Sequence, residues 1–191
     1  MPIRNTVTHY GSVAKFFHWV IAIFVIYMIP LGFLMGGVKT PTLQNLLFAI
    51  HKSSGLTILF LLILRYIWRL SSTRPKFPAD MPVWQAKMAN WSHKLLYLLI
   101  FIQPLSGWVM TTASSNAPSF WWIVNIPAPW VTPNKTVADV AGFIHHYCAW
   151  VIVGAVSLHI IGALEHWIIR RDGVFQRMLP NSLKKKQFYD E

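Results

Sequence analysis

The chain alternates long apolar runs with short polar segments rich in lysine and arginine. Four runs are long enough to cross a bilayer as helices, which takes about 20 residues each. They occupy about residues 15–37, 46–70, 90–113 and 140–170. The second run qualifies because His51, Lys52 and Arg65 lie near its ends. The pattern predicts an all-α protein, an integral membrane four-helix bundle formed by residues 1–191 as a single domain.

One further apolar segment, from Ser119 to Trp130, is too short to span a bilayer. It contains two prolines, and its three tryptophans suit the interface between lipid and water. We expect it to be an interfacial loop.

Amino-acid composition excludes several other classes of protein. The 191 residues are 54% hydrophobic and only 12% charged, and the mean hydropathy is +0.44. A soluble domain carries about twice that charged fraction, and a disordered chain is poor in apolar residues. Cys148 is the only cysteine, which excludes a disulfide scaffold and the two-cysteine attachment of c-type haem.

The positive charges predict the orientation in the membrane. With four spans, both termini share one side with the segment between the second and third spans. That side carries fourteen lysines and arginines, whereas the other side carries three. The fourteen are Arg4, Lys15, Arg65, Arg69, Arg74, Lys76, Lys87, Lys94, Arg170, Arg171, Arg177 and Lys184 to Lys186. Positive residues favour the cytoplasm, so we expect both termini there, and the net charge of +11 reflects topology rather than binding to nucleic acid.

Seven of the eight histidines lie in or beside the apolar runs, where an imidazole costs free energy unless it finds a partner. His145, His159 and His166 share one face of the fourth helix, because 14 and 7 residues are close to whole numbers of turns. His145 and His159 are separated by about 21 Å along that helix. The fourth helix therefore offers one imidazole near each membrane face.

Partners for these imidazoles follow from the direction of the other spans. His51 lies at the outer end of the second span, level with His145. At the inner level, depth alone allows either His18 or His93 to face His159. Facing imidazoles in a helix bundle are typical of bis-histidine haem. Zinc is less suitable, because it needs three or four ligands at one point.

Six motifs also occur in an order and spacing similar to those of a known family. They are YGSVAKFFHW at 10–19, HKSSG at 51–55, RYIWRL at 65–70, HKLLYLL at 93–99, QPLSGW at 103–108 and DGVFQRMLP at 172–180. From about Tyr10 to Pro180 the chain resembles the bacterial cytochrome b561 family of four-helix membrane cytochromes. Relatives of that family include the cytochrome b subunits of hydrogenase and formate dehydrogenase.

The resemblance implies two haems b and their ligands. It assigns His51 and His145 to the outer haem iron. It assigns His18 and His159 to the inner one, and the resemblance alone favours His18 over His93 here. His93 and His166 then remain near the inner face, where imidazole can bond a quinone headgroup and carry protons. We expect these two residues to form part of a quinone site.

Within the family, the similarity is strongest to the superoxide oxidase type. It implies that electrons pass from periplasmic superoxide through two haems to ubiquinone, in the bacterial inner membrane. Superoxide is an anion, and the three outer lysines, Lys39, Lys52 and Lys135, are expected to attract it. The alternative is a quinone-linked relay or anchor subunit for a dehydrogenase or hydrogenase partner.

Overall fold

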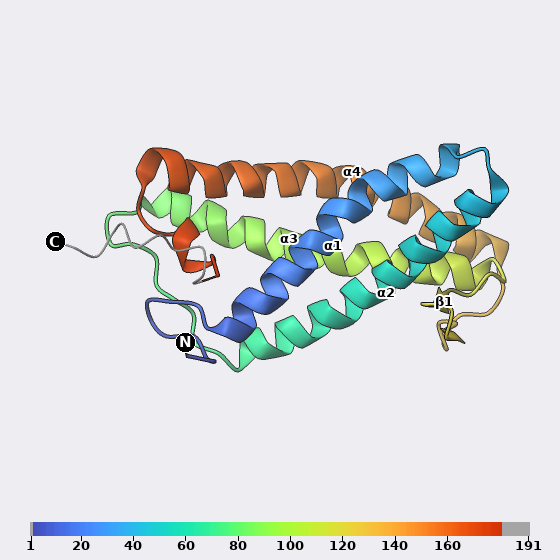
Figure 1. The fold of residues 1–191 in the computed structure, drawn as a ribbon, viewed down its shortest axis with the longest axis horizontal. Coiled ribbons are helices and arrows are strands. Elements are labelled where there is room, and N and C mark those ends of the chain that lie inside the picture. Colours follow the sequence, from blue (N-terminus) through green and yellow to red (C-terminus); the bar gives the residue numbers. More distant parts are fainter. Residues whose placement is uncertain (1, 181–191) are drawn as a thin grey trace.

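The computed structural model describes residues 2–180 as four long helices that run along one axis (Figure 1). In chain order the elements are α1 (Ser12–Leu34), the 3₁₀ turn η1 (Met35–Gly37), α2 (Pro41–Leu70), α3 (Val83–Ala113), β1 (Ser119–Phe120), β2 (Val124–Asn125), α4 (Lys135–Leu164), the π-helical turn η2 (Glu165–Arg170) and the 3₁₀ turn η3 (Phe175–Arg177). The predicted four-helix membrane fold is confirmed, because each long helix is apolar and long enough to span a bilayer. Lys184 to Lys186, which contributed to the charge count, lie outside the described residues.

The helices begin three to seven residues before the predicted spans. Pro41 occupies the first turn of α2, where its missing N–H costs no helical hydrogen bond. Asn134 caps α4, its side-chain oxygen accepting a hydrogen bond from the Val137 N–H at 3.1 Å. The first turns of α2 and α4 contain polar residues such as Gln44 and Lys135, so an estimate based on apolar length alone places these two starts too late.

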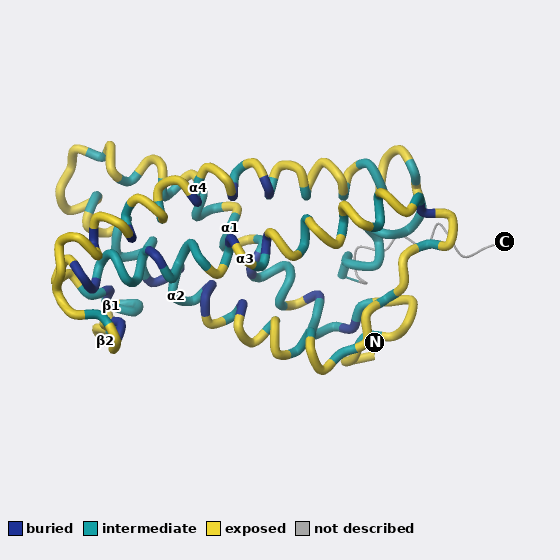
Figure 2. The backbone as a smooth tube through the Cα atoms, turned by 180° about the vertical axis from the view of Figure 1, so that it is seen from behind, coloured by how far each residue is buried: buried dark blue, intermediate teal, exposed yellow. Residues whose placement is uncertain are grey.

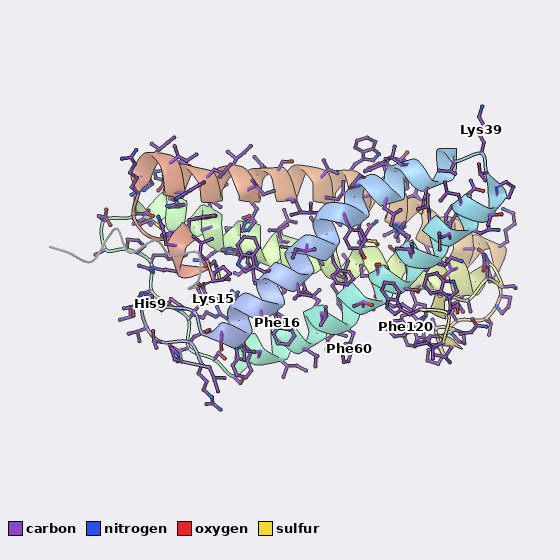
Figure 3. The ribbon with its side chains drawn as sticks, in the orientation of Figure 1. His9, Lys15, Phe16, Lys39, Phe60 and Phe120 are labelled. Carbon is purple, nitrogen blue, oxygen red and sulfur yellow. The ribbon has the colours of Figure 1, made fainter. Side chains whose placement is uncertain are left out.

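The bundle consists of two closely packed helix pairs. α3 packs most extensively against α4, α1 packs against α2, and α2 also contacts α3. A buried cluster between α3 and α4 consists of Leu96, Leu99, Cys148, Ile152 and Ala155. Elsewhere buried positions are short segments along helices that are otherwise half-buried or exposed (Figure 2). The exposed surface is apolar, as at Phe16 and Phe60 (Figure 3), which fits contact with lipid.

The N-terminus and the end of α4 lie at one end of the bundle, and the turn between α1 and α2 lies at the other with β1 (Figure 1). That the first of these ends faces the cytoplasm stays a prediction from the charge distribution. The predicted interfacial loop contains a small hairpin, in which Ser119 pairs with Asn125. The buried Ser53 side chain attaches this hairpin to α2. It donates to the Ser119 carbonyl at 3.0 Å and accepts from the Trp121 N–H at 2.9 Å.

Candidate functional site

Two pairs of histidine rings face each other across the bundle, one toward each end. His51 of α2 and His145 of α4 have ring centroids 6.1 Å apart, with an angle of 83° between the ring planes. His18 of α1 and His159 of α4 have centroids 6.3 Å apart and planes at 81°. α4 therefore contributes one ring to each pair.

The spacing within each pair fits one metal ion bound between two imidazoles. A metal–nitrogen bond of about 2 Å, with about 1.1 Å from that nitrogen to the ring centre, gives centroids about 6.2 Å apart. His93 also faces His159, but at 5.4 Å, which is too short for that arrangement. The geometry thus supports the pairing of His18 with His159. Among residues 2–180, no three His, Cys, Asp or Glu side chains gather closely enough to hold a metal ion on their own.

A cavity of about 1110 Å³ lies beside the outer pair, between all four helices and the segment before β1. Ligand pockets usually measure about 300–1,000 Å³, so the cavity has room for a large planar cofactor. Two glycines leave space for the rings at its wall. A Cβ at Gly32 would lie 3.2 Å from Cε1 of His51, and one at Gly107 would lie 2.9 Å from Cε1 of His145.

Hydrogen bonds around His145 fix which of its nitrogens can bind a metal. Its Nδ1 lies 2.8 Å from the Gln103 carbonyl oxygen. A carbonyl can only accept, so Nδ1 carries the proton and Nε2 keeps its lone pair. The Ser106 hydroxyl donates to the same carbonyl at 2.8 Å. In His51, the buried Nδ1 has no hydrogen-bond partner among the residues that the structure describes.

These features agree with the comparison to known proteins. The model of the prokaryotic cytochrome b561 family matches residues 9–181. The chain belongs to this family. It is therefore a membrane electron-transfer protein of a family that binds haem b, and the expected resemblance is confirmed.

Three relatives are similar over most of their length. "Cytochrome b561 homolog 2" of Escherichia coli (strain K12) is 32% identical over 191 residues, covering 95% of this chain and 97% of the relative. "Cytochrome b561 homolog 1" of the same organism is 28% identical over 168 residues, 86% of this chain and 93% of the relative. "Probable superoxide oxidase CybB" of Yersinia pestis is 25% identical over 167 residues, 85% of this chain and 91% of the relative.

In this cytochrome b561 chain, the two residues expected at a quinone site lie at different depths. His93 faces His159, whereas His166 follows His159 by about 10 Å along α4 and η2. Nδ1 of His166 lies 2.6 Å from Oδ2 of Asp172. Burial alone would raise the pKa of Asp172, but hydrogen bonds from the Val174 N–H, His166 and Arg170 outweigh it and hold that pKa below its usual value. Asp172 therefore stays ionised beside His166.

The three lysines expected to attract superoxide have different surroundings. Lys39 projects from the turn between α1 and α2 (Figure 3). Lys135 is exposed and forms an ion pair with Asp139 at 2.6 Å. Lys52 is half-buried and lines the cavity beside His51. Only Lys52 of these three contributes to the cavity wall.

Several residues around the outer pair have roles that the sequence did not suggest. Gln103, Ser106 and Gly107 all contact His145, and all three belong to the QPLSGW motif. The motif identified the family, but its contacts with His145 depend on how α3 packs against α4. Asp172 is similar, because it opens the DGVFQRMLP motif and meets His166 only through the turn after η2.

Proposed function

We propose that the chain binds two haems b, with His51 and His145 at the outer site and His18 and His159 at the inner site. The observation that carries this proposal is the separation of 6.1 Å and 6.3 Å within the two pairs. Haem bound at these sites supplies one-electron transfer between the two membrane faces. The protein sets the position, the potential and the access of each site.

Counting haem per chain in alanine variants of the four ligands tests this assignment. Each variant is expected to retain one haem, whereas wild type retains two. His146→Ala is a matched control, because His146 is exposed and adjacent to His145, and it is expected to retain both. Retention of two haems with unchanged spectra in His51→Ala or His145→Ala would contradict the outer assignment.

We further propose that superoxide is the electron donor and ubiquinone the acceptor. Two superoxide ions lose one electron each and leave as two O₂ molecules. Ubiquinone takes both electrons and two protons and becomes ubiquinol. The support is a relative named as a superoxide oxidase, together with a cavity at the outer pair whose wall includes a cation, Lys52.

At the opposite end, His93 and His166 are our candidates for the quinone site. Nδ1 of His166 lies within hydrogen-bond distance of the Asp172 carboxylate, which orients the ring, and an imidazole held in this way can pass a proton to reduced quinone. His166→Ala is expected to slow ubiquinone reduction by about 100-fold, within the usual range for removal of an acid–base group. Reduction of both haems by superoxide should be unchanged in that variant.

The superoxide proposal is tested by rapid mixing of the purified protein with superoxide. Both haems are expected to be reduced, at a rate that falls as salt rises. Lys52→Gln should slow this reduction more than Lys135→Gln does, because Lys135 already has a carboxylate partner. Haems that dithionite reduces and superoxide does not would refute the donor but leave the ligands intact.

One observation favours the second candidate, a relay or anchor subunit for a partner enzyme. Trp122 and Ile123 at the tip of the hairpin are exposed by 58% and 81%. An exposed apolar tip suits contact with a partner as well as with lipid. Copurification of a dehydrogenase or hydrogenase that Ile123→Asp abolishes would support the relay, and absence of any partner would favour the superoxide reaction.

A further inference from the structure

Two arginines on α2 lie at the level of the inner histidine pair. Arg65 follows His51 by 14 residues, the same spacing that separates His145 from His159 on α4. Fourteen residues bring a helix back to nearly the same face about 21 Å farther on. α2 therefore presents His51 to the outer site and Arg65 to the inner one, and Arg65 is close enough to His18 and His159 to interact with them electrostatically.

Tyr97 of α3 holds both arginines in place. Nε of Arg65 donates to the Tyr97 hydroxyl at 2.8 Å. The guanidinium carbons of Arg65 and Arg69 lie 5.7 Å and 5.2 Å from the centre of the Tyr97 ring, which is within range of a cation–π interaction. Because Nε of Arg65 is engaged, its two terminal nitrogens remain available as a fork.

These cations have no counter-charge within the protein that the structure describes. Among residues 2–180, the ion pairs involve Lys135, His166 and Arg170, and no carboxylate lies within ion-pair distance of Arg65 or Arg69. Both arginines are half-buried in a helix long and apolar enough to span the membrane. A guanidinium group in such a place is costly unless an anion accompanies it, so the structure needs an anion that the described chain does not supply.

We infer that Arg65 and Arg69 form a carboxylate-binding site that holds the propionate groups of the inner haem. Haem b carries two carboxylates, and a guanidinium fork binds a carboxylate through two parallel, charge-assisted hydrogen bonds. Tyr97 orients the fork toward that ligand. This inference rests on the proposed binding of haem by His18 and His159. A lipid phosphate has similar chemistry and is the alternative source of the anion.

Arg65→Gln and Arg69→Gln, purified in full-length form, test the inference against Arg74→Gln. Arg74 is exposed in the segment after α2, so the control removes the same charge away from the site. The haem that remains in His51→Ala identifies the spectrum and midpoint potential of the inner haem. Arg65→Gln is expected to lower that potential, because loss of a nearby cation stabilises ferric iron, and to reduce haem retained toward one per chain. The outer haem and the control should match wild type.

A second experiment distinguishes haem propionate from lipid phosphate as the source of the anion. Wild type and Arg65→Gln are reconstituted with haem dimethyl ester, whose propionates carry no charge. If Arg65 binds propionate, the ester lowers retention at the inner site in wild type and has no further effect in the variant. Unchanged inner-haem retention and potential in Arg65→Gln, with loss of tightly bound phospholipid instead, would overturn the inference in favour of lipid phosphate. Absence of haem from wild type would instead refute the proposed function.

Discussion

Replacement of Gly107 by alanine should selectively damage the outer haem site. A Cβ at this position would lie 2.9 Å from Cε1 and 3.1 Å from Nδ1 of His145. Carbon atoms in contact are normally about 3.5–4.0 Å apart, so the ring has to move by roughly 0.6 Å or more. A metal–ligand distance tolerates only about 0.2 Å. Because the Gln103 carbonyl also restrains His145, the ring cannot move without losing a hydrogen bond.

The energetic cost is moderate, which keeps the variant foldable. Overpacking a filled site costs about 1–3 kcal/mol, and replacement of glycine by alanine within a helix recovers about 1 kcal/mol. The net loss is therefore roughly 0–2 kcal/mol, small enough for the bundle to form. The expected result is about one haem per chain, or a second haem with a weakened axial bond and an altered spectrum.

Two other glycines make the test quantitative. Gly32→Ala should have a milder effect, because its Cβ would lie 3.2 Å from Cε1 of His51. Gly154→Ala is the control, since no atom of residues 2–180 lies within 4 Å of a Cβ there, and it should retain both haems. Haem content per chain and redox spectra check this order. Two haems with wild-type spectra and potentials in Gly107→Ala would refute the reasoning, as would equal damage in Gly154→Ala.

Three further predictions concern the surroundings of the histidines. Ser106→Ala should lower the midpoint potential of the outer haem by roughly a few tens of millivolts, as measured by redox titration. Without the hydrogen bond from Ser106, the Gln103 carbonyl accepts a stronger hydrogen bond from Nδ1 of His145. The imidazole then donates more electron density to the iron. Asp172→Asn should lower the melting temperature at pH 7. Since its folded pKa is depressed, the stability from Asp172 is present above its unfolded value near 3.8 and is lost as pH falls through the folded value, so the two proteins should converge in acid. Protein produced without haem should melt at a lower temperature than loaded protein, because a ligand at about 1,000 times its Kd stabilises by about 4 kcal/mol.

The helices and the outer pair could be predicted from the sequence because each depends on one-dimensional spacing. Apolar length predicts the four helices, and depth along antiparallel spans brings His51 and His145 to the same level. Depth could not choose between His18 and His93, because both lie near the inner face. That choice depends on a difference between 6.3 Å and 5.4 Å, which is set by how the helices pack. The hydrogen bond between the Gln103 carbonyl and His145 could not be predicted for a related reason. Every residue has a backbone carbonyl, and only the packing of α3 against α4 determines which one meets His145.

With the same spacing of 14 residues, α2 and α4 contribute different side chains at the depths of the two histidine pairs. α4 contributes a histidine to both pairs, so a shift of α4 along its axis would displace His145 and His159 together. α2 contributes a histidine to the outer pair and an arginine at the inner level, where α1 supplies His18 instead. α2 also contributes a cation at each level, Arg65 near the inner pair and Lys52 in the wall of the cavity beside the outer pair. A nearby positive charge favours the ferrous over the ferric state, so each cation would favour electron acceptance by the haem proposed at its own level, and charge from α2 alone does not set the direction of electron flow.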